Sequence, residues 1–193
     1  MSVSEKTFRE IAIADPSGQW EYDCGRMRRK PPMTYAHNRT EVNLFRQLDP
    51  QIDPARFDLR MNAGHVHIPD TKYYIPDLFV IPIELTESQR ASRDLETYDQ
   101  PLPLVVEVWS RTTATYDVQA KLLEYQRRGD LEIWLIHPYD RTVTAWRRQS
   151  DGSYQDTVHT SGSIEISSLP SLTITWMVSS TKGRGRLVQF ANC

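Results

Sequence analysis

The stretch Ile75–Pro138 decides the fold of this chain. It contains three apolar runs of strand length, IPDLFVIPI at 75–83, PLVVEVWS at 103–110 and LEIWLIHP at 131–138. Runs that are apolar on both faces are typical of strands buried in the middle of a sheet. Between the second and third runs, residues 113–128 have helical spacing, and Gly129 follows as a helix-ending glycine. The predicted order is therefore strand, strand, helix, strand.

Two carboxylates interrupt the apolar runs. Asp77 lies at the entrance of the first strand, directly after Pro76, and Glu107 lies in the middle of the second. Burying an unpaired carboxylate is costly, so Glu107 needs a cation, a hydrogen-bond donor or a proton. A salt bridge to lysine or arginine satisfies Glu107 as well as a metal ion does. The sequence therefore leaves open whether Glu107 is an ion-pair partner or a metal ligand. For Asp77 the alternative is a turn or capping carboxylate after proline.

The predicted helix 113–128 carries three polar residues at successive spacings of four: Asp117, Lys121 and Tyr125. Residues four apart share one face of a helix, so these side chains point the same way. The simplest alternative for Asp117 and Lys121 is an ordinary surface ion pair worth a few tenths of a kcal/mol.

An earlier helix is predicted over residues 34–48, with an apolar stripe formed by Tyr35, Val42, Phe45 and Leu48. His37 and Glu41 lie four apart and share a face of it. On spacing alone, a surface pair is favoured over a role in a functional site.

The N-terminal 33 residues are expected to form an irregular start with one short helix over 5–14. They include a basic cluster formed by Arg26, Arg28, Arg29 and Lys30. A solvated loop is the commoner use of such a cluster, and a phosphate-contacting arm is the alternative. His65 and His67 are expected to be exposed on an edge strand, and residues 84–100 to form a surface loop with a short helix. A hairpin over 142–160 and two further strands complete the expected elements.

Composition limits the class of protein. The 193 residues are most simply one domain, and a formal charge of -2 does not indicate a constitutive nucleic-acid binder. An enzyme that cuts nucleic acid needs only a local basic surface. Cys24 and Cys193 form no CxxC motif, which favours a reduced, cytoplasmic setting. We expect no association with membranes, because no secretory signal and no apolar segment of bilayer-spanning length is present.

These acids and the lysine suit hydrolysis of phosphodiesters. A divalent ion neutralises phosphate charge, lowers the pKa of bound water and orients the leaving group. Mg²⁺ prefers oxygen ligands, which Asp77, Glu107 and the backbone carbonyl of Val108 could supply. Lys121, reaching in from the helix, could orient the attacking water or stabilise the charge that develops on the phosphate. The cofactor expected is therefore Mg²⁺ or Mn²⁺.

The same residues carry a resemblance to a known family. The pattern comprises Pro76-Asp77, Val106-Glu107-Val108, Ser110, Asp117, Lys121, Tyr125, Gly129 and Trp134. It resembles the Uma-two family of putative restriction endonucleases, within the PD-(D/E)XK nuclease superfamily, from roughly His37 to the end of the chain. The resemblance implies an α/β fold with a restriction-endonuclease-like core, in which helices flank a central mixed sheet, and a C-terminal β-hairpin extension. We expect one domain over 1–193, with an N-terminal extension over 1–33 and the core over 34–193.

The resemblance also implies an activity, that of a metal-dependent endonuclease acting on DNA, with Asp77 and Glu107 as metal ligands. The superfamily's usual lysine lies two residues after the second acid, where this chain has Trp109. The lysine role would fall to Lys121, which belongs to the family pattern. From the family's own pattern this chain departs at His137, where an acid is common, and at Trp109, where a smaller aliphatic residue is common. Both departures bear on substrate preference more than on chemistry.

The remaining polar residues of the pattern receive supporting roles. Asp117 would orient Lys121 or a ligand water, and His37 and Glu41 are second-tier candidates for the site.

The rival interpretation is a non-catalytic module of the same fold that binds nucleic acid or protein. In it, the two acids and Lys121 form a buried ion-pair network, and the net negative charge supports it. A homodimer would suit an endonuclease because cutting a duplex takes two nicks, but nothing in the sequence requires one.

Overall fold

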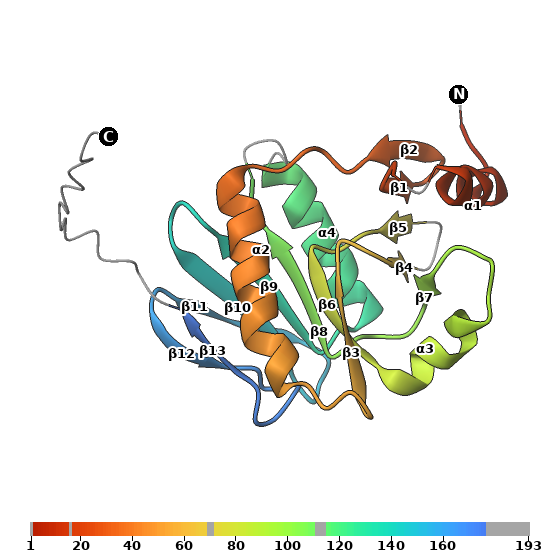
Figure 1. The fold of residues 1–193 in the computed structure, drawn as a ribbon. Coiled ribbons are helices and arrows are strands. Elements are labelled where there is room, and N and C mark those ends of the chain that lie inside the picture. The colour runs from red at the N-terminus through yellow and green to blue at the C-terminus, as the bar shows by residue number, and fades with distance from the viewer. Residues whose placement is uncertain (1, 16, 69–71, 111–114, 177–193) are drawn as a thin grey trace, which may run out of the picture.

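The centre of the molecule is a six-stranded mixed sheet (Figure 1). The computed structural model describes residues 2–15, 17–68, 72–110 and 115–176, and only the backbone of 115–117. In spatial order the strands are β11 (Tyr154–His159), β10 (Thr142–Arg148), β9 (Glu132–His137), β8 (Leu104–Val108), β6 (Leu78–Pro82) and β3 (Phe57–Met61). β8 and β9 run parallel, whereas the other neighbours are antiparallel. The predicted mixed sheet is confirmed.

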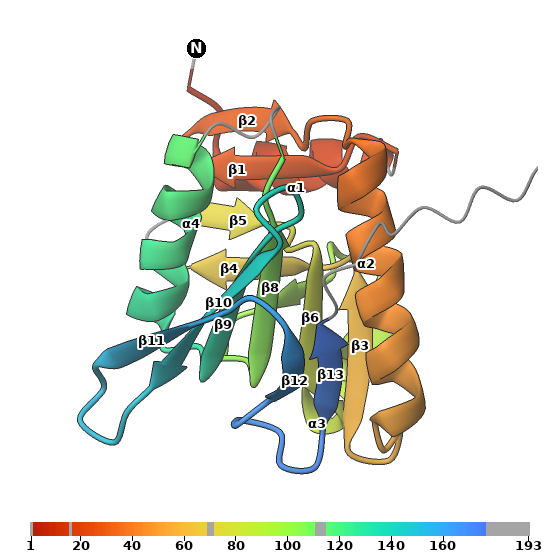
Figure 2. The same ribbon diagram turned by 90° about the vertical axis from the view of Figure 1, so that its left-hand side faces the viewer.

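One helix covers each face of this sheet, which Figure 2 shows edge-on between them. α2 (Tyr35–Leu48) begins at Thr34, whose hydroxyl accepts a hydrogen bond from the His37 amide at 3.3 Å. α4 (Thr115–Arg128) ends at Gly129, whose positive φ of 90° suits a residue without a Cβ. Both helices and the predicted helix end are confirmed.

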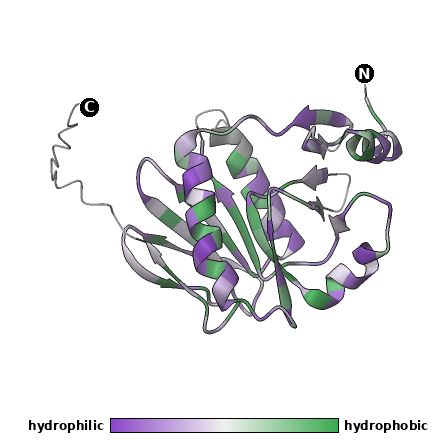
Figure 3. Cartoon of the chain, in the orientation of Figure 1, coloured by the Kyte–Doolittle hydropathy of each residue, from purple (hydrophilic) through white to green (hydrophobic). Residues whose placement is uncertain are grey.

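The strands at the centre alternate their side chains between two cores. Val106 and Val108 of β8 pack with Leu44 of α2, whereas Val105 packs with Tyr125 of α4. Hydrophobic residues accordingly concentrate on the central strands, while the outlying β2 is mostly hydrophilic (Figure 3). Because both faces of β8 are buried, a carboxylate on this strand is largely shielded from bulk water, and Glu107 is only 7% exposed.

A second sheet lies beside the first, near the N-terminal end of α2 (Figure 1). Its strands, in spatial order, are β2 (Arg26–Arg29), β1 (Trp20–Asp23), β5 (Lys72–Tyr74), β4 (His65–Ile68) and β7 (Thr97–Tyr98). α1 (Glu5–Ala14) packs on it through Phe8, whose ring stacks on Tyr22 with centroids 5.0 Å apart. The turn of the β1–β2 hairpin has positive φ at Cys24 and Gly25, as a two-residue type I′ turn requires.

This second sheet overturns three expectations. The helix over 5–14 is confirmed, but the rest of the N-terminal stretch is a hairpin and not irregular. The edge-strand prediction for His65 is also wrong, because β4 lies between β5 and β7 and His65 is buried, with Nε2 2.9 Å from the Trp20 carbonyl oxygen. The stretch 84–100 does contain the expected short helix, as most of α3 (Ile83–Arg90), but it also contains β7, so the part expected to be a loop is in part a strand.

The last two described strands, β12 (Gly162–Glu165) and β13 (Thr173–Trp176), form a third, two-stranded sheet. It packs on α2, where the Thr175 amide donates to Gln47 Oε1 at 2.7 Å, and near the short 3₁₀ helix η1 (Asp49–Gln51). The predicted C-terminal hairpin is therefore present. Among the residues that the structure describes, no helix has the length and apolar character needed to cross a membrane.

Candidate active site

Asp77 lies one residue before β6 and is fixed by three groups. Its Oδ1 lies 2.5 Å from Lys30 Nζ, and its Oδ2 lies 3.0 Å from His37 Nε2. The amide of Val108 also donates to Oδ2, at 2.6 Å. Burial favours the neutral acid, but the Lys30 charge and the His37 hydrogen bond outweigh it and hold the pKa of Asp77 well below its usual range. Asp77 is therefore a buried, permanently ionised carboxylate.

Glu107 is held differently, in the middle of β8. Its Oε1 accepts a hydrogen bond from the Tyr125 hydroxyl at 2.6 Å and lies 3.5 Å from Lys121 Nζ. Burial is the main cause that raises the pKa of Glu107 to about 7. The positive charge of Lys121 opposes this shift, whereas the negative charges of Asp77 and Glu21 reinforce it. Glu107 can therefore gain or lose a proton near neutral pH.

Lys121 extends from α4 between two acids. Its Nζ donates to Glu21 Oε1 at 2.6 Å and lies farther from Glu107. Burial alone would lower the pKa of Lys121, but the carboxylates of Glu107 and Glu21 raise it, so the amine stays protonated. Glu21 also accepts the Ile75 amide at 3.0 Å, which ties the lysine to the segment that leads into Asp77.

Asp77, Glu107, Val108 and Lys121 all line one small cavity. Its volume of about 10 Å³ is near the lower limit for a single water molecule. The donor set fits a hard divalent cation, because the carboxylates of Asp77 and Glu107 face a space that Glu21 also lines, and Mg²⁺ is bound by one or two carboxylates with waters. In addition, Asp77 Oδ1 accepts no hydrogen bond of good geometry from the described residues. The ammonium of Lys30 lies against that same oxygen.

His37 and Glu41 lie behind Asp77, on α2. The ligating atoms of His37, Glu41 and Asp77 all lie within 4.8 Å of one another, close enough to share a metal ion. His37 Nδ1 is buried, lies 3.5 Å from Glu41 Oε1 and has no hydrogen-bond partner in the described part of the chain. Both side chains are buried, so the surface pair favoured from their spacing is wrong.

The profile of the Uma2 family, described as putative restriction endonucleases, matches residues 6–179. This chain belongs to the Uma2 family. The resemblance to Uma-two inferred from the motif is thus confirmed, and the match begins well before His37, where the motif placed its start.

A solved structure gives the fold independently. The chain is similar to a putative nuclease belonging to DUF820 from Anabaena variabilis, with a TM-score of 0.60 and 18% sequence identity. The similarity covers 73% of this chain and 76% of that one. No curated protein matches. Membership of a family described as putative restriction endonucleases supports a nuclease-like hydrolase at a coarse level, with nucleic acid as the class of substrate.

In this Uma2 family member, the N-terminal hairpin supplies two site residues that the sequence did not reveal. Glu21 on β1 pairs with Lys121, and Lys30, just after β2, pairs with Asp77 and also donates to Asn62 Oδ1 at 2.7 Å. Gly25, within a short stretch where apolar residues alternate, is the one sequence signal that could have indicated this hairpin.

The basic cluster on that hairpin is not a solvated loop. Lys30 is buried at the site, Arg28 Nε lies 3.4 Å from Glu21 Oε2, and Arg29 lies 2.7 Å from Asp15. A phosphate contact by these arginines stays a prediction. Asp117 lies on α4, but its side chain falls outside the described residues, as does any contact with Lys121.

Proposed function

We propose that this chain is a metal-dependent endonuclease that hydrolyses phosphodiester bonds in DNA, with Mg²⁺ or Mn²⁺ as its ion. One observation carries the proposal. Asp77, Glu107 and Lys121 come from a strand entrance, a strand and a helix, and all three line one cavity. Membership of a family described as putative restriction endonucleases supports it.

In the proposed site, Asp77 and Glu107 bind the ion, with the Val108 carbonyl as a further oxygen ligand. The ion, when bound, would neutralise the phosphate and activate a water molecule. Asp77 is ionised at every pH of interest, whereas Glu107 must release a proton before it can act as a ligand.

Lys121 is proposed to stabilise the charge that develops on the scissile phosphate. Its ammonium is protonated and held at 2.6 Å by Glu21, so its position is fixed before substrate arrives. His37 and Glu41 are proposed as positioning residues that hold Asp77 from behind, and Asp117 as a residue that orients Lys121 or a ligand water. A homodimer would supply the two nicks that cleavage of a duplex requires.

The test is cleavage of supercoiled plasmid, of short duplexes and of the same oligonucleotides as single strands, in Mg²⁺ or Mn²⁺. Glu107→Gln keeps the shape of the side chain but removes a ligand, so we expect at least about a 100-fold loss of rate. Glu132→Gln is the matched control, because Glu132 is also buried, on the neighbouring strand, and contacts Trp134 and Arg147, which do not line the cavity. Absence of cleavage by the wild type, or equal rates for the two variants, would refute the proposal.

A second candidate function has its own observation. Every charge at the cavity already has a protein partner, with Lys30 against Asp77 and Lys121 against Glu21. A non-catalytic binding module would retain this arrangement as a buried ion-pair network. Calorimetry with Mn²⁺ separates the two: the module gives no saturable heat, whereas the enzyme gives binding that Asp77→Asn abolishes.

A further inference from the structure

Three aromatic residues that the proposed chemistry does not use form a cluster at the ends of β8 and β9. The rings of Trp109 and His137 stack with centroids 4.2 Å apart and planes 27° from parallel. Tyr139 meets Trp109 edge-on, with centroids 5.8 Å apart. Trp109 and His137 are also the two residues that we expected to bear on substrate preference, and the structure brings them into one contact.

This aromatic cluster adjoins the proposed metal site. Trp109 follows Val108, whose amide holds Asp77, and the Trp109 amide donates to the Ile136 carbonyl at 2.8 Å. On the other side, the hydroxyls of Tyr139 and Thr34 lie 3.2 Å apart, and Thr34 also caps the helix turn that contains His37. A group bound on the cluster would therefore lie beside the nucleotide undergoing hydrolysis.

The cluster is accessible from solvent. Tyr139 is 45% exposed, and Trp109 and His137 are half-buried, unlike the buried aromatic residues of the two cores. The Asp140 amide donates to His137 Nδ1 at 3.0 Å, which holds the imidazole ring in its place in the stack. Flat aromatic faces that remain partly exposed after folding can receive another ring.

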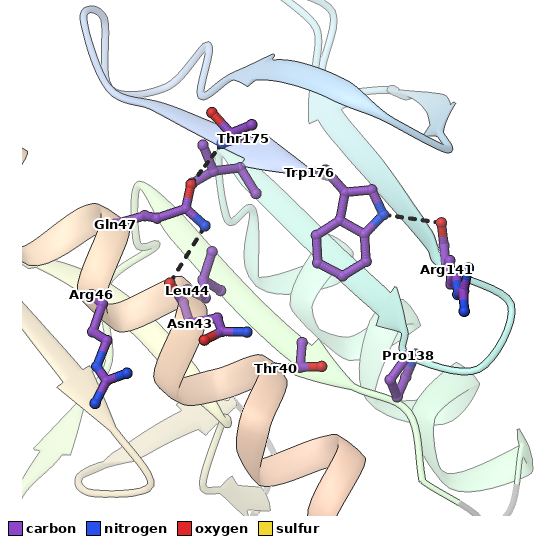
Figure 4. Close-up of a pocket in the computed structure, with 10 residues that line it drawn as sticks. Thr40, Asn43, Leu44, Arg46, Gln47, Pro138, Arg141, Thr175 and Trp176 are labelled. Carbon is purple, nitrogen blue, oxygen red and sulfur yellow. Dashed lines mark hydrogen bonds between the residues drawn. The ribbon is translucent and has the colours of Figure 1, made fainter. Parts of the chain in front are cut away.

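A groove of about 490 Å³ begins at the same turn and runs between α2 and β13 (Figure 4). Pro138 and Arg141 line it from the turn, Arg46 lines it from α2, and Trp176 forms part of its wall. The Trp176 indole donates to the Arg141 carbonyl at 2.9 Å, which fixes the wall. No acidic residue lines this groove among the residues that the structure describes, so its charge complements a phosphate backbone.

We propose that the aromatic cluster of Trp109, His137 and Tyr139 stacks an unpaired base of the nucleic acid, while the adjoining backbone follows the groove past Arg141 and Arg46. Aromatic faces beside a positively charged groove are the arrangement that binds single-stranded nucleic acid. A base within an intact duplex is already stacked on its neighbours and is not available. The proposal rests on the proposed nuclease function and specifies its substrate class as single strands, overhangs or frayed ends.

The test is equilibrium binding of a fluorescein-labelled oligonucleotide, single-stranded or annealed into a blunt duplex, in EDTA so that no strand is cut. We expect the wild type to bind the single strand more tightly than the duplex. Trp109→Ala should weaken single-strand binding about 10-fold, with little effect on the duplex, because base–aromatic stacking contributes on that scale. Trp109→Phe, which keeps a flat ring, should restore most of the affinity.

Trp146→Ala is the matched control, because Trp146 lies opposite Ile133, at the other end of β9 from His137. It should leave binding of the single strand unchanged. Should Trp109→Ala fail to fold, as judged by thermal unfolding, Tyr139→Ala takes its place, since Tyr139 is largely exposed. A 2-aminopurine base in the single strand should lose fluorescence on binding to the wild type and less on binding to either cluster variant.

Equal affinity for single strand and duplex, or unchanged single-strand binding by Trp109→Ala and Tyr139→Ala, would overturn the proposal. These outcomes are distinct from failure of the nuclease assignment, because binding is measured without metal. Stacking that depends on Trp109 in a protein that cuts nothing would uphold this site and refute hydrolysis. Cleavage that depends on Glu107, in a protein that shows no stacking on Trp109, would uphold hydrolysis and refute the stacking site.

Discussion

Asp77 and Glu107 lie on neighbouring segments and face one cavity, yet their surroundings differ. Asp77 receives an ammonium, an imidazole and a backbone amide, whereas Glu107 receives the Tyr125 hydroxyl at 2.6 Å and a more distant lysine. The pKa of Asp77 is consequently held well below its usual range, while burial raises that of Glu107 to about 7. Equal burial therefore produces opposite protonation behaviour, because the donors around each carboxylate differ.

The difference suggests that the two carboxylates contribute to metal binding in different ways. An ionised Asp77 is ready to hold a cation but is already neutralised by Lys30. Glu107 contributes its negative charge only when it loses a proton, so its charge can appear together with an arriving metal ion.

The largest expected effect is on stability. Asp77→Asn leaves the buried ammonium of Lys30 without its counter-charge and should lower the free energy of unfolding by about 3–5 kcal/mol. Glu107→Gln at pH 6 replaces a largely protonated acid by a neutral isostere and should cost less than about 1 kcal/mol. Urea denaturation of both variants measures the two costs, and equal costs would remove the contrast. Asp130→Asn, which breaks the buried pair with Arg128 outside the site, controls for general damage.

Removing the competing cation should strengthen metal binding. Lys30→Met removes the ammonium that lies 2.5 Å from Asp77 Oδ1. We expect the affinity for Mn²⁺ to rise about 10-fold or more, because an ammonium and a metal cation this close together repel by several kcal/mol. Lys6→Met, a change at an exposed lysine, should leave the affinity unchanged. Isothermal titration calorimetry measures both. Weaker binding by Lys30→Met would mean that Lys30 supports the metal site instead of competing for it.

The raised pKa of Glu107 makes metal affinity depend on pH. Between pH 8 and pH 6 the proton on Glu107 increasingly competes with the ion, so Mn²⁺ affinity should fall about 10-fold across this window. Binding near pH 6 should release a proton, which appears as a heat that varies with buffer ionisation enthalpy. The same raised pKa makes the free energy of unfolding depend on pH. Protonated Glu107 contributes its full stabilisation below pH 4.5, and this contribution is lost as pH rises through 7. Glu107→Gln should abolish both dependences.

Tyr125→Phe should have the smallest effect. The Tyr125 hydroxyl donates to Glu107, and a donor of this kind favours the ionised carboxylate by about 1 kcal/mol. Its removal should move the pH midpoint of Mn²⁺ affinity upward by less than about one unit. An unchanged midpoint would show that Tyr125 only packs against β8.

The central part of the fold and the meeting of the three principal candidate residues at one cavity could be predicted from sequence because their signals are local. The apolar runs of β6, β8 and β9 and the helix-ending Gly129 identify the frame, and a carboxylate within an apolar strand identifies Glu107. The contacts that the sequence did not predict arise from tertiary packing. Glu21 lies 100 residues from Lys121 in sequence, and its short strand pairs with β2, where three of four residues are arginine.

Burial was the least predictable property. His37 and Glu41 have the spacing of a surface pair, and only the position of Asp77 against α2 makes them interior. His65 is likewise buried because α1 and the N-terminal hairpin pack over its strand. A spacing rule gives the face on which a side chain lies, but it does not give what covers that face.

The most direct test of the site is an anomalous-difference map from crystals soaked in Mn²⁺. We predict one peak within coordination distance of carboxylate oxygens from both Asp77 and Glu107, with Lys30 Nζ displaced from Asp77 Oδ1. No peak at this cavity at saturating Mn²⁺, or a peak bound by only one of the two acids, would contradict the shared metal site.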